Sequence, residues 1–285
     1  MRKILERLLV FFIGIPAVGV IVLFLPFYSH LTMNIFVIVF SAIGAYEFSK
    51  MLGNRQLNIN KIEAVLLGAS APLAATLIAS FNFPRGIFSI FFMAGACWII
   101  FSGVFTRADK MEMAAGRLAA GFSAMIYPGF FMCWLVNMSL WGNSRAILIF
   151  LMIVFGSDSA AWFCGNLFGT NNRGIIAASP NKSAAGFIGG ISGAIIVSGC
   201  AALIVPDVFV TRLNMHIVLS AVILGVCTGI AATLGDLAES AVKRSCNVKD
   251  SGNIMLGRGG ILDSIDSIAA AAPVYFLLFS LFFNN

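Results

Sequence analysis

Long uncharged stretches dominate the chain, and each has about the length that a helix needs to cross a lipid bilayer. A hydrocarbon core about 30 Å thick takes about 20 mostly apolar residues at the helical rise. Residues 8–46 contain no Asp, Glu, Lys or Arg and suit two spans, separated by a break at residues 26–30. Seven further stretches run near 64–84, 86–106, 118–141, 146–165, 184–205, 213–235 and 267–283. The pattern predicts an all-α polytopic integral membrane protein with about nine transmembrane helices.

The basic residues predict how these helices are oriented. Cytoplasmic loops of membrane proteins carry an excess of Lys and Arg. If the N-terminus is cytoplasmic, 15 of the 18 Lys and Arg residues fall in inner segments, and the outer segments hold only Arg85, Arg145 and Arg212. We therefore expect a multi-pass protein with a cytoplasmic N-terminus and an outer C-terminus.

Composition supports a membrane protein and excludes several other classes. Apolar residues make up 60% of the chain, charged residues make up 11%, and the mean hydropathy is +0.97. A soluble globular domain usually carries about a quarter charged residues. The net charge of +6 is spread through apolar sequence, so no solvated basic surface for nucleic acid is expected. The predicted partner is the lipid bilayer, and no nucleic acid.

Acidic residues gather near the end of the eighth predicted span. Inserting an ionisable side chain at membrane depth costs about 2.5–3.5 kcal/mol. A group of such side chains near a span therefore indicates a specific role. Asp236 and Lys243 lie seven residues apart, which places them on one helical stripe with Glu239 and beside Ser240. The alternative interpretation is a solvated connector in which acids offset bases. The five acids of this segment are Asp236, Glu239, Asp250, Asp263 and Asp266.

A loop and a glycine-rich turn follow this stripe. Residues 249–253 form the predicted loop, and residues 256–260 form a turn that opens a helix near Ile261. Backbone N–H groups of such a turn can bind phosphate. Asp263 and Asp266 then lie three residues apart in the first turns of the last helix, where their oxygens can hold a hard cation.

A second polar segment lies between the sixth and seventh spans. Asp158 interrupts an otherwise apolar stretch, which predicts a satisfied or functional partner. Ser179-Pro180 is typical of a helix start, with Lys182 in the first turns, and suits either phosphate binding or a plain N-cap. The glycines at 186, 189, 190 and 193 include two G-x-x-x-G spacings, which favour a close helix-packing face.

The two histidines restrict the chemistry. His30 and His216 both map to the predicted outer side, away from the acidic cluster, which disfavours a histidine metal site or a Ser/His/Asp hydrolase. Carboxylates, cations and backbone amides suit phosphoryl or nucleotidyl transfer assisted by a divalent metal ion.

The same segments carry a family resemblance. The run from Ser240 to Asp266 resembles the signature of the phosphatidate cytidylyltransferase (CDP-diacylglycerol synthase) family. Gly235-Asp236-Leu-Ala-Glu239 and Ser179-Pro-Asn-Lys182 with Gly186 match that family in order and spacing, and the resemblance covers about residues 155–285. The chain departs from the family at Arg258, Ser264 and Ala185, where histidine, arginine and glutamate are usual.

The resemblance implies transfer of CMP from CTP to phosphatidic acid with Mg²⁺, at the cytoplasmic face of the cell (inner) membrane. It implies metal binding by Asp236, Asp250, Asp263 and Asp266. The catalytic residues implied are Asp236, Lys243, Arg244, Lys249 and Asp250. The substrate-binding residues implied are Ser179, Lys182, Glu239, Gly252, Arg258, Gly259 and Gly260.

The expected organisation is an N-terminal region of about five spans, residues 1–145, and a C-terminal catalytic region, residues 146–285. Its cytoplasmic-facing segments are residues 157–190 and 236–266. The alternatives are a CTP-dependent lipid (polyprenol) kinase, an inactive paralogue and a transporter. A homodimer is considered for the oligomeric state.

Overall fold

The computed structural model describes residues 13–105, 108–212, 215–255, 257 and 259–283. These residues are almost entirely helical, and the described part contains isolated β-bridges but no strand. In lipid an α-helix satisfies its own backbone hydrogen bonds, which is why so apolar a chain folds in this way. The all-α fold predicted from the sequence is confirmed.

The chain forms two compact units, which are described separately. The first unit comprises Met1–Leu140 and Lys243–Ile265, and the second comprises Trp141–Val242 and Asp266–Asn285. The segment 243–265 therefore belongs with N-terminal helices, although it is far from them in sequence. The functional division expected at residue 145 stays a prediction.

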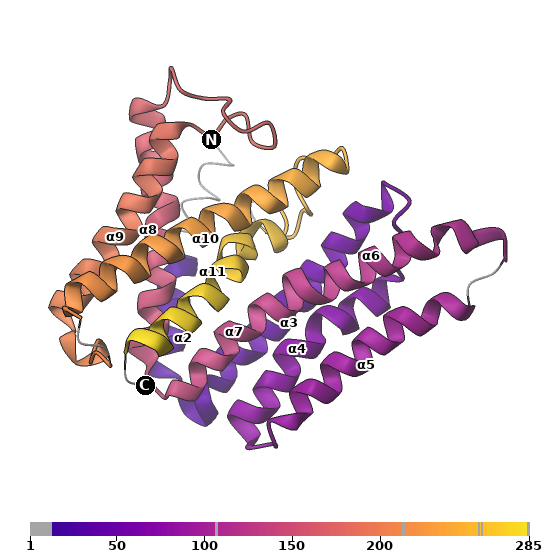
Figure 1. Cartoon of the computed structure of the whole chain (residues 1–285), viewed down its shortest axis with the longest axis horizontal. Helices are drawn as coiled ribbons and strands as arrows, with labels where there is room; N and C mark the ends of the chain where they lie inside the picture. Colours follow the sequence, from indigo (N-terminus) through magenta and orange to yellow (C-terminus); the bar gives the residue numbers. More distant parts are fainter. Residues whose placement is uncertain (1–12, 106–107, 213–214, 256, 258, 284–285) are drawn as a thin grey trace. The chain divides into compact units, whose positions relative to one another are not determined.

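Six helices form most of the described part of the first unit. Helix α4 packs against α3, α5, α6 and α7, so it lies at the centre of this unit (Figure 1). A π-helical segment, Ile126–Phe130, joins α6 to α7, and Gly129 there brings its backbone close to Gly68 of α4. The helices of this unit are α2 (Ile15–Phe24), α3 (Phe27–Gly53), α4 (Lys61–Phe81), α5 (Gly86–Ser102), α6 (Ala114–Met125) and α7 (Phe131–Met138).

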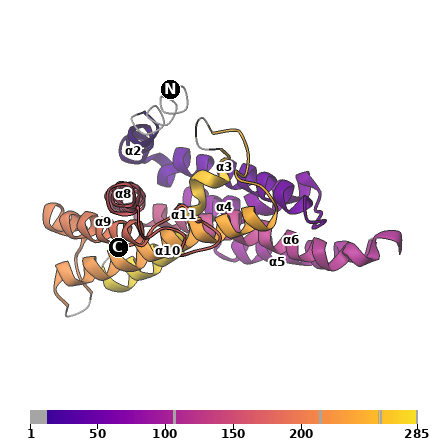
Figure 2. The ribbon, with the colours of Figure 1, turned by 90° about the horizontal axis from the view of Figure 1, so that it is seen from above.

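Helices α8 (Ser144–Phe168), α9 (Ala184–Ile204), α10 (Ile217–Ser245) and α11 (Leu262–Phe282) supply the second unit, to which α10 and α11 contribute most of their length. Figure 2 shows α8 end-on with α9 beside it. A Cβ atom on Gly190 would lie 3.2 Å from Ala161 Cβ of α8, and one on Gly193 would lie 3.0 Å from the Gly156 carbonyl oxygen. The helix-packing face predicted from the glycine spacing is confirmed.

Small residues and one tyrosine bring the other helices of this unit together. A Cβ atom on Gly229 of α10 would lie 2.7 Å from Ala194 of α9, and one on Gly235 would lie 2.5 Å from the Asp266 carbonyl oxygen of α11. The buried Tyr275 hydroxyl of α11 donates to the Ala146 carbonyl of α8 over 2.9 Å. The Gly235 contact places polar residues of α10 and α11 near one another, and the Tyr275 bond joins α11 to the first turn of α8.

The described helices lie where the sequence predicted membrane spans. Seven helices in the described part are long and apolar enough to cross a membrane, and Ile15–Phe24 and Gly86–Ser102 are shorter apolar helices. The predicted break after Pro26 is present, since Tyr28, Ser29 and His30 have left-handed φ angles of 49°, 52° and 58°. The count of nine spans and the orientation of the N-terminus stay predictions.

Candidate functional site

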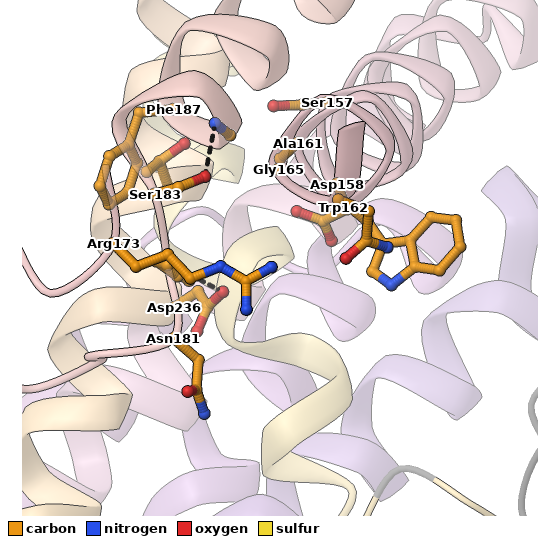
Figure 3. A pocket seen from close by; sticks show the side chains of 14 residues that line it. Ser157, Asp158, Ala161, Trp162, Gly165, Arg173, Asn181, Ser183, Phe187 and Asp236 are labelled. Atoms are coloured by element: carbon orange, nitrogen blue, oxygen red, sulfur yellow. Dashed lines mark hydrogen bonds and ion pairs between the residues drawn. The ribbon is translucent and has the colours of Figure 1, made fainter. Parts of the chain in front are cut away.

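A cavity of about 290 Å³ lies in the second unit, at the polar end of α8 (Figure 3). Its walls come from α8, from the loop before α9, from the start of α9 and from α10. Asp158 and Trp162 line it from α8, Lys182 lines it from the loop and Asp236 lines it from α10. The pocket thus combines acids and bases from three segments that the sequence singled out.

The loop before α9 is tied to the start of that helix. An isolated antiparallel bridge joins Arg173 to Ser183, and the Ala184 N–H donates to the Asn172 carbonyl over 3.0 Å. These bonds hold both ends of the loop together. The Arg173 guanidinium points into the pocket, between Asp236 and the side occupied by Asp158 (Figure 3).

The helix start predicted at Ser179-Pro180 is wrong. Helix α9 begins at Ala184, and Ser183 is its N-cap, with the Ser183 hydroxyl accepting from the Gly186 N–H over 3.1 Å. The residues from Ser179 to Lys182 form a turn, closed by the Lys182 N–H donating to the Ser179 carbonyl. Ser183 takes the cap because its extended backbone lets its hydroxyl reach the first turn. Lys182 therefore lies before the helix.

An ion pair crosses the pocket. Lys182 Nζ lies 2.5 Å from Asp236 Oδ2, and the two side chains are 28% and 33% exposed. The Ser240 hydroxyl donates to the other carboxylate oxygen of Asp236 over 3.4 Å, one helical turn along α10. The Lys182 ammonium also lies over the Phe187 ring, 5.9 Å from its centroid. The pair is ordered and still open to the cavity.

Carboxylates outnumber cations at this end of the second unit. Asp266 of α11 is 7% exposed and interacts electrostatically with Asp236, Glu239 and Asp158. Close packing of α10 on α11 at Gly235 brings these acids together. Mutual repulsion makes such a group unfavourable by itself, and a cation relieves it. Hard oxygen donors of this kind suit a divalent ion such as Mg²⁺.

A second polar cluster, here called the loop cluster, lies in the first unit. Lys243 Nζ lies 2.5 Å from Asp263 Oδ1, and these side chains are 11% and 7% exposed. Asp263 Oδ2 accepts from the Ser251 N–H at 2.9 Å, the Ser251 hydroxyl at 2.9 Å and the Gly260 N–H at 2.7 Å. Asp263 is thus held by four donors.

Glycines shape the loop cluster. Met255 and Gly259 form an antiparallel bridge, and Gly257 and Gly259 have φ angles of 70° and 104°, which glycine adopts without strain. A Cβ atom on Gly259 would lie 2.6 Å from Asp263 Oδ2 and 3.0 Å from Asp250 Cβ. The glycine-rich turn before α11 is confirmed. The Gly260 N–H of this turn donates to Asp263, so this group binds a carboxylate of the protein itself.

The remaining predicted site residues have varied surroundings. Helix α10 carries Glu239, which is fully buried, and Arg244, which donates to the Val248 carbonyl over 3.3 Å. Lys249 and Asp250 are exposed in the following loop. Ser179 is outside the pocket lining, and Arg258 lies outside the described residues. Their expected roles in catalysis and binding stay predictions.

The predicted metal ligands divide between the two units. Asp236 and Asp266 belong to the second unit, whereas Asp250 and Asp263 belong to the first. Within the described ranges, no three His, Cys, Asp or Glu side chains converge closely enough to hold a metal ion. The chemistry of the carboxylates fits a hard divalent cation, and their assignment as ligands stays a prediction.

The sequence reasoning missed two residues. Arg173 was counted only as an inner basic residue, and its place in the pocket depends on a bridge that no local pattern shows. Glu47 was not considered, although it is a single carboxylate that ends a long uncharged stretch and is 1% exposed. An isolated acid in a predicted span is itself a signal of function.

Known proteins resemble the chain over most of its length. The sequence model of the cytidylyltransferase family matches residues 5–282, so the chain belongs to this family. It is 34% identical to a phosphatidate cytidylyltransferase of Thermotoga maritima over 221 residues, which cover 76% of this chain and 77% of the relative. It is 28% identical to a phosphatidate cytidylyltransferase of Brucella suis biovar 1 over 264 residues, which cover 93% of this chain and 90% of the relative. The family makes the protein a nucleotidyltransferase.

Proposed function

We propose that the protein transfers CMP from CTP to phosphatidic acid, forming CDP-diacylglycerol and pyrophosphate. The relatives named phosphatidate cytidylyltransferase support this substrate pair. The observation that carries the proposal is the pocket in the second unit, where two cations, Lys182 and Arg173, face the carboxylates Asp158 and Asp236. Such a set stabilises phosphate charge and positions a metal-bound nucleotide.

The reaction needs charge neutralisation more than proton transfer. A phosphate oxygen of phosphatidic acid attacks the α-phosphorus of CTP, a new P–O bond forms, and the bond to the β-phosphate breaks as pyrophosphate leaves. The attacking phosphate is already anionic near neutral pH, so a strong general base is unnecessary. This agrees with a pocket that neither His30 nor His216 lines. Lys182 and Arg173 would each bind a phosphate oxygen.

Bound Mg²⁺ would supply positive charge to the triphosphate. The proposed ligands are Asp236 and Asp266 within the second unit, and Asp250 and Asp263 within the first. Lys243, Arg244 and Lys249 are proposed to meet further phosphate charge. Ser179, Glu239, Gly252, Arg258, Gly259 and Gly260 are proposed to contact the substrates. In the loop cluster, Asp263 pairs with Lys243.

The proposed place of action is the cytoplasmic face of the inner membrane, in a multi-pass protein. Support comes from the basic residues, 15 of which fall in predicted inner segments, and from CTP being a cytosolic solute. A homodimer remains a prediction, which light scattering of the protein in detergent tests.

The proposal is tested with the purified protein in detergent, phosphatidic acid, Mg²⁺ and CTP labelled at either the α- or the γ-phosphate. Cytidylyl transfer places the α-label in the lipid and the γ-label in pyrophosphate. A CTP-dependent lipid kinase would instead place the γ-label in the lipid and release CDP. If neither the α-label nor the γ-label appeared in the lipid, both activities would be contradicted. That result would favour a protein without transferase activity. The variant Asp207→Asn is a suitable control, since Asp207 pairs with Arg145 outside the pocket and the loop cluster.

A further inference from the structure

Glu47 of α3 is a buried carboxylate that reaches the segment 243–265 within the first unit. Its Oε2 atom accepts from the Ser251 hydroxyl at 3.1 Å and from the Leu262 N–H at 2.9 Å. Leu262 is the first residue of α11, whose leading N–H groups have no partner within their own helix. Glu47 therefore caps α11 from another helix and holds the loop before it.

Two glycines of the loop are required by this carboxylate. A Cβ atom on Gly252 would lie 2.7 Å from Glu47 Cδ and 3.2 Å from Glu47 Cγ, and its three nearest neighbours would all be Glu47 atoms. A Cβ atom on Gly260 would also lie 2.7 Å from Glu47 Cδ. The backbone thus closes around Glu47 on two sides. Both glycines belong to the proposed site. The Glu47 carboxylate occupies the space that a side chain at either position would need, which explains why glycine is present there.

Ser251 connects Glu47 to the ion pair of the loop cluster. The same hydroxyl that lies 3.1 Å from Glu47 Oε2 lies 2.9 Å from Asp263 Oδ2, and the other oxygen of Asp263 lies 2.5 Å from Lys243 Nζ. A shift of the Glu47 carboxylate would therefore move Ser251 and the start of α11, which together orient Asp263.

We propose that Glu47 is a positioning residue for cytidylyl transfer, acting through Ser251 and the N-terminus of α11 on Asp263 and Lys243. This inference rests on the proposed function of the loop cluster. A purely structural role is a poor explanation, because burying a carboxylate is costly and Glu47 Oε1 has no hydrogen-bond partner within the described part of the chain.

The test compares Glu47→Gln with the wild type in the labelled-CTP assay. The amide keeps the shape of the side chain but loses its charge and one acceptor. Misplacing groups that act on the reaction costs about 10- to 100-fold in turnover, and we expect a fall of that size in kcat. The KM values for CTP and phosphatidic acid should change by less than about threefold, because no substrate contact is lost.

The matched control is Glu63→Gln. Glu63 is another largely buried glutamate of the first unit, bonded to Arg117 at 3.0 Å and to Trp98 at 2.7 Å, and neither partner belongs to the loop cluster. It should keep the wild-type kcat. Equal losses in the two variants would overturn the positioning role, since they would reflect general destabilisation.

Hydrogen–deuterium exchange gives a readout that does not depend on turnover. In Glu47→Gln the peptide covering 247–262 should exchange faster than in the wild type, since the Leu262 N–H loses a charged acceptor. The same peptide should be unaffected in Glu63→Gln. A fall in kcat with unchanged exchange in this peptide would overturn the inference.

A double-mutant cycle with Gly252→Ala completes the experiment. The new methyl group must displace the Glu47 carboxylate, so the single variant should lose turnover to a similar degree as Glu47→Gln. The two changes disrupt one contact, and the double variant should be little worse than either single one. Additive losses would overturn the inference. A wild type without cytidylyl transfer would instead refute the proposed function, and an active wild type matched by Glu47→Gln would refute the positioning role alone.

Discussion

The pocket and the loop cluster contain the same chemical pair in different surroundings. Each has a lysine ammonium 2.5 Å from an aspartate oxygen. The Lys182–Asp236 pair is about a third exposed and lines a cavity, whereas the Lys243–Asp263 pair is buried and receives three more hydrogen bonds at Asp263. A pair open to a cavity can exchange its partner for a ligand. A buried, fully bonded pair instead keeps the geometry around it.

The same Asp-to-Asn substitution in the two pairs should therefore have different effects. In the buried pair both activity and stability should fall, and in the partly exposed pair mainly activity should fall. Breaking a buried pair leaves an uncompensated charge and is strongly destabilising. Breaking a partly exposed pair costs little stability, because water solvates the remaining charge.

The variant Asp263→Asn should have the largest effect, on both properties. It removes the carboxylate charge 2.5 Å from the largely buried Lys243 ammonium, and we expect the free energy of unfolding to fall by about 3 kcal/mol. Turnover should fall by about 1000-fold, as when a preorganised electrostatic group is removed. Denaturation in detergent and the labelled-CTP assay measure the two effects. Asp250→Asn, at an exposed position, should lose turnover with nearly unchanged stability; a stable, active Asp263→Asn would refute the contrast.

The variant Asp236→Asn should lose turnover by about 100-fold, as expected for a residue that orients the groups around a reacting phosphate. The unfolding free energy should change by less than about 1 kcal/mol, since the pair with Lys182 is partly exposed. The same two assays apply, with Asp207→Asn as the control for loss of an exposed aspartate ion pair. A stability loss as large as that of Asp263→Asn would show that the pairs do not differ in this way.

The variant Arg173→Ala should raise the KM for a phosphate-bearing substrate by about tenfold, which corresponds to about 1.4 kcal/mol of binding. Arg173 points into the pocket and has no ion-pair partner among the described residues, so its charge is available to a ligand. Steady-state kinetics with CTP and phosphatidic acid varied in turn will identify the substrate affected. Arg85→Ala, at the start of α5, serves as the control. Unchanged KM values for both substrates would exclude Arg173 from binding.

The variant Ser183→Ala should have the smallest effect, a loss of about 1 kcal/mol in unfolding free energy, because it removes the N-cap of α9. Ser179→Ala should be nearly neutral in the same denaturation experiment. A larger loss for Ser179→Ala would place the functional cap where the sequence pattern first indicated it.

Local sequence patterns were enough to predict where the helices lie and how α8 and α9 pack. A bilayer-long apolar stretch and a G-x-x-x-G spacing are properties of neighbouring residues, so the spans and the α8–α9 face could be predicted without a structure. The acids, bases and glycines located both polar segments, and the long, ordered run from Ser240 to Asp266 indicated the family. The start of α9 was misplaced, since Ser179-Pro180 and Ser183 both have cap chemistry and only the backbone geometry distinguishes them.

Only the tertiary structure decided which charges meet. Lys182 and Asp236 are 54 residues apart, and Glu47 and Ser251 are 204 residues apart. No periodicity connects such positions, because their approach depends on how whole helices pack and on where glycines let backbones close together. For the same reason Arg173 enters the pocket only through its bridge to Ser183, and Glu47 caps a helix that begins more than two hundred residues later.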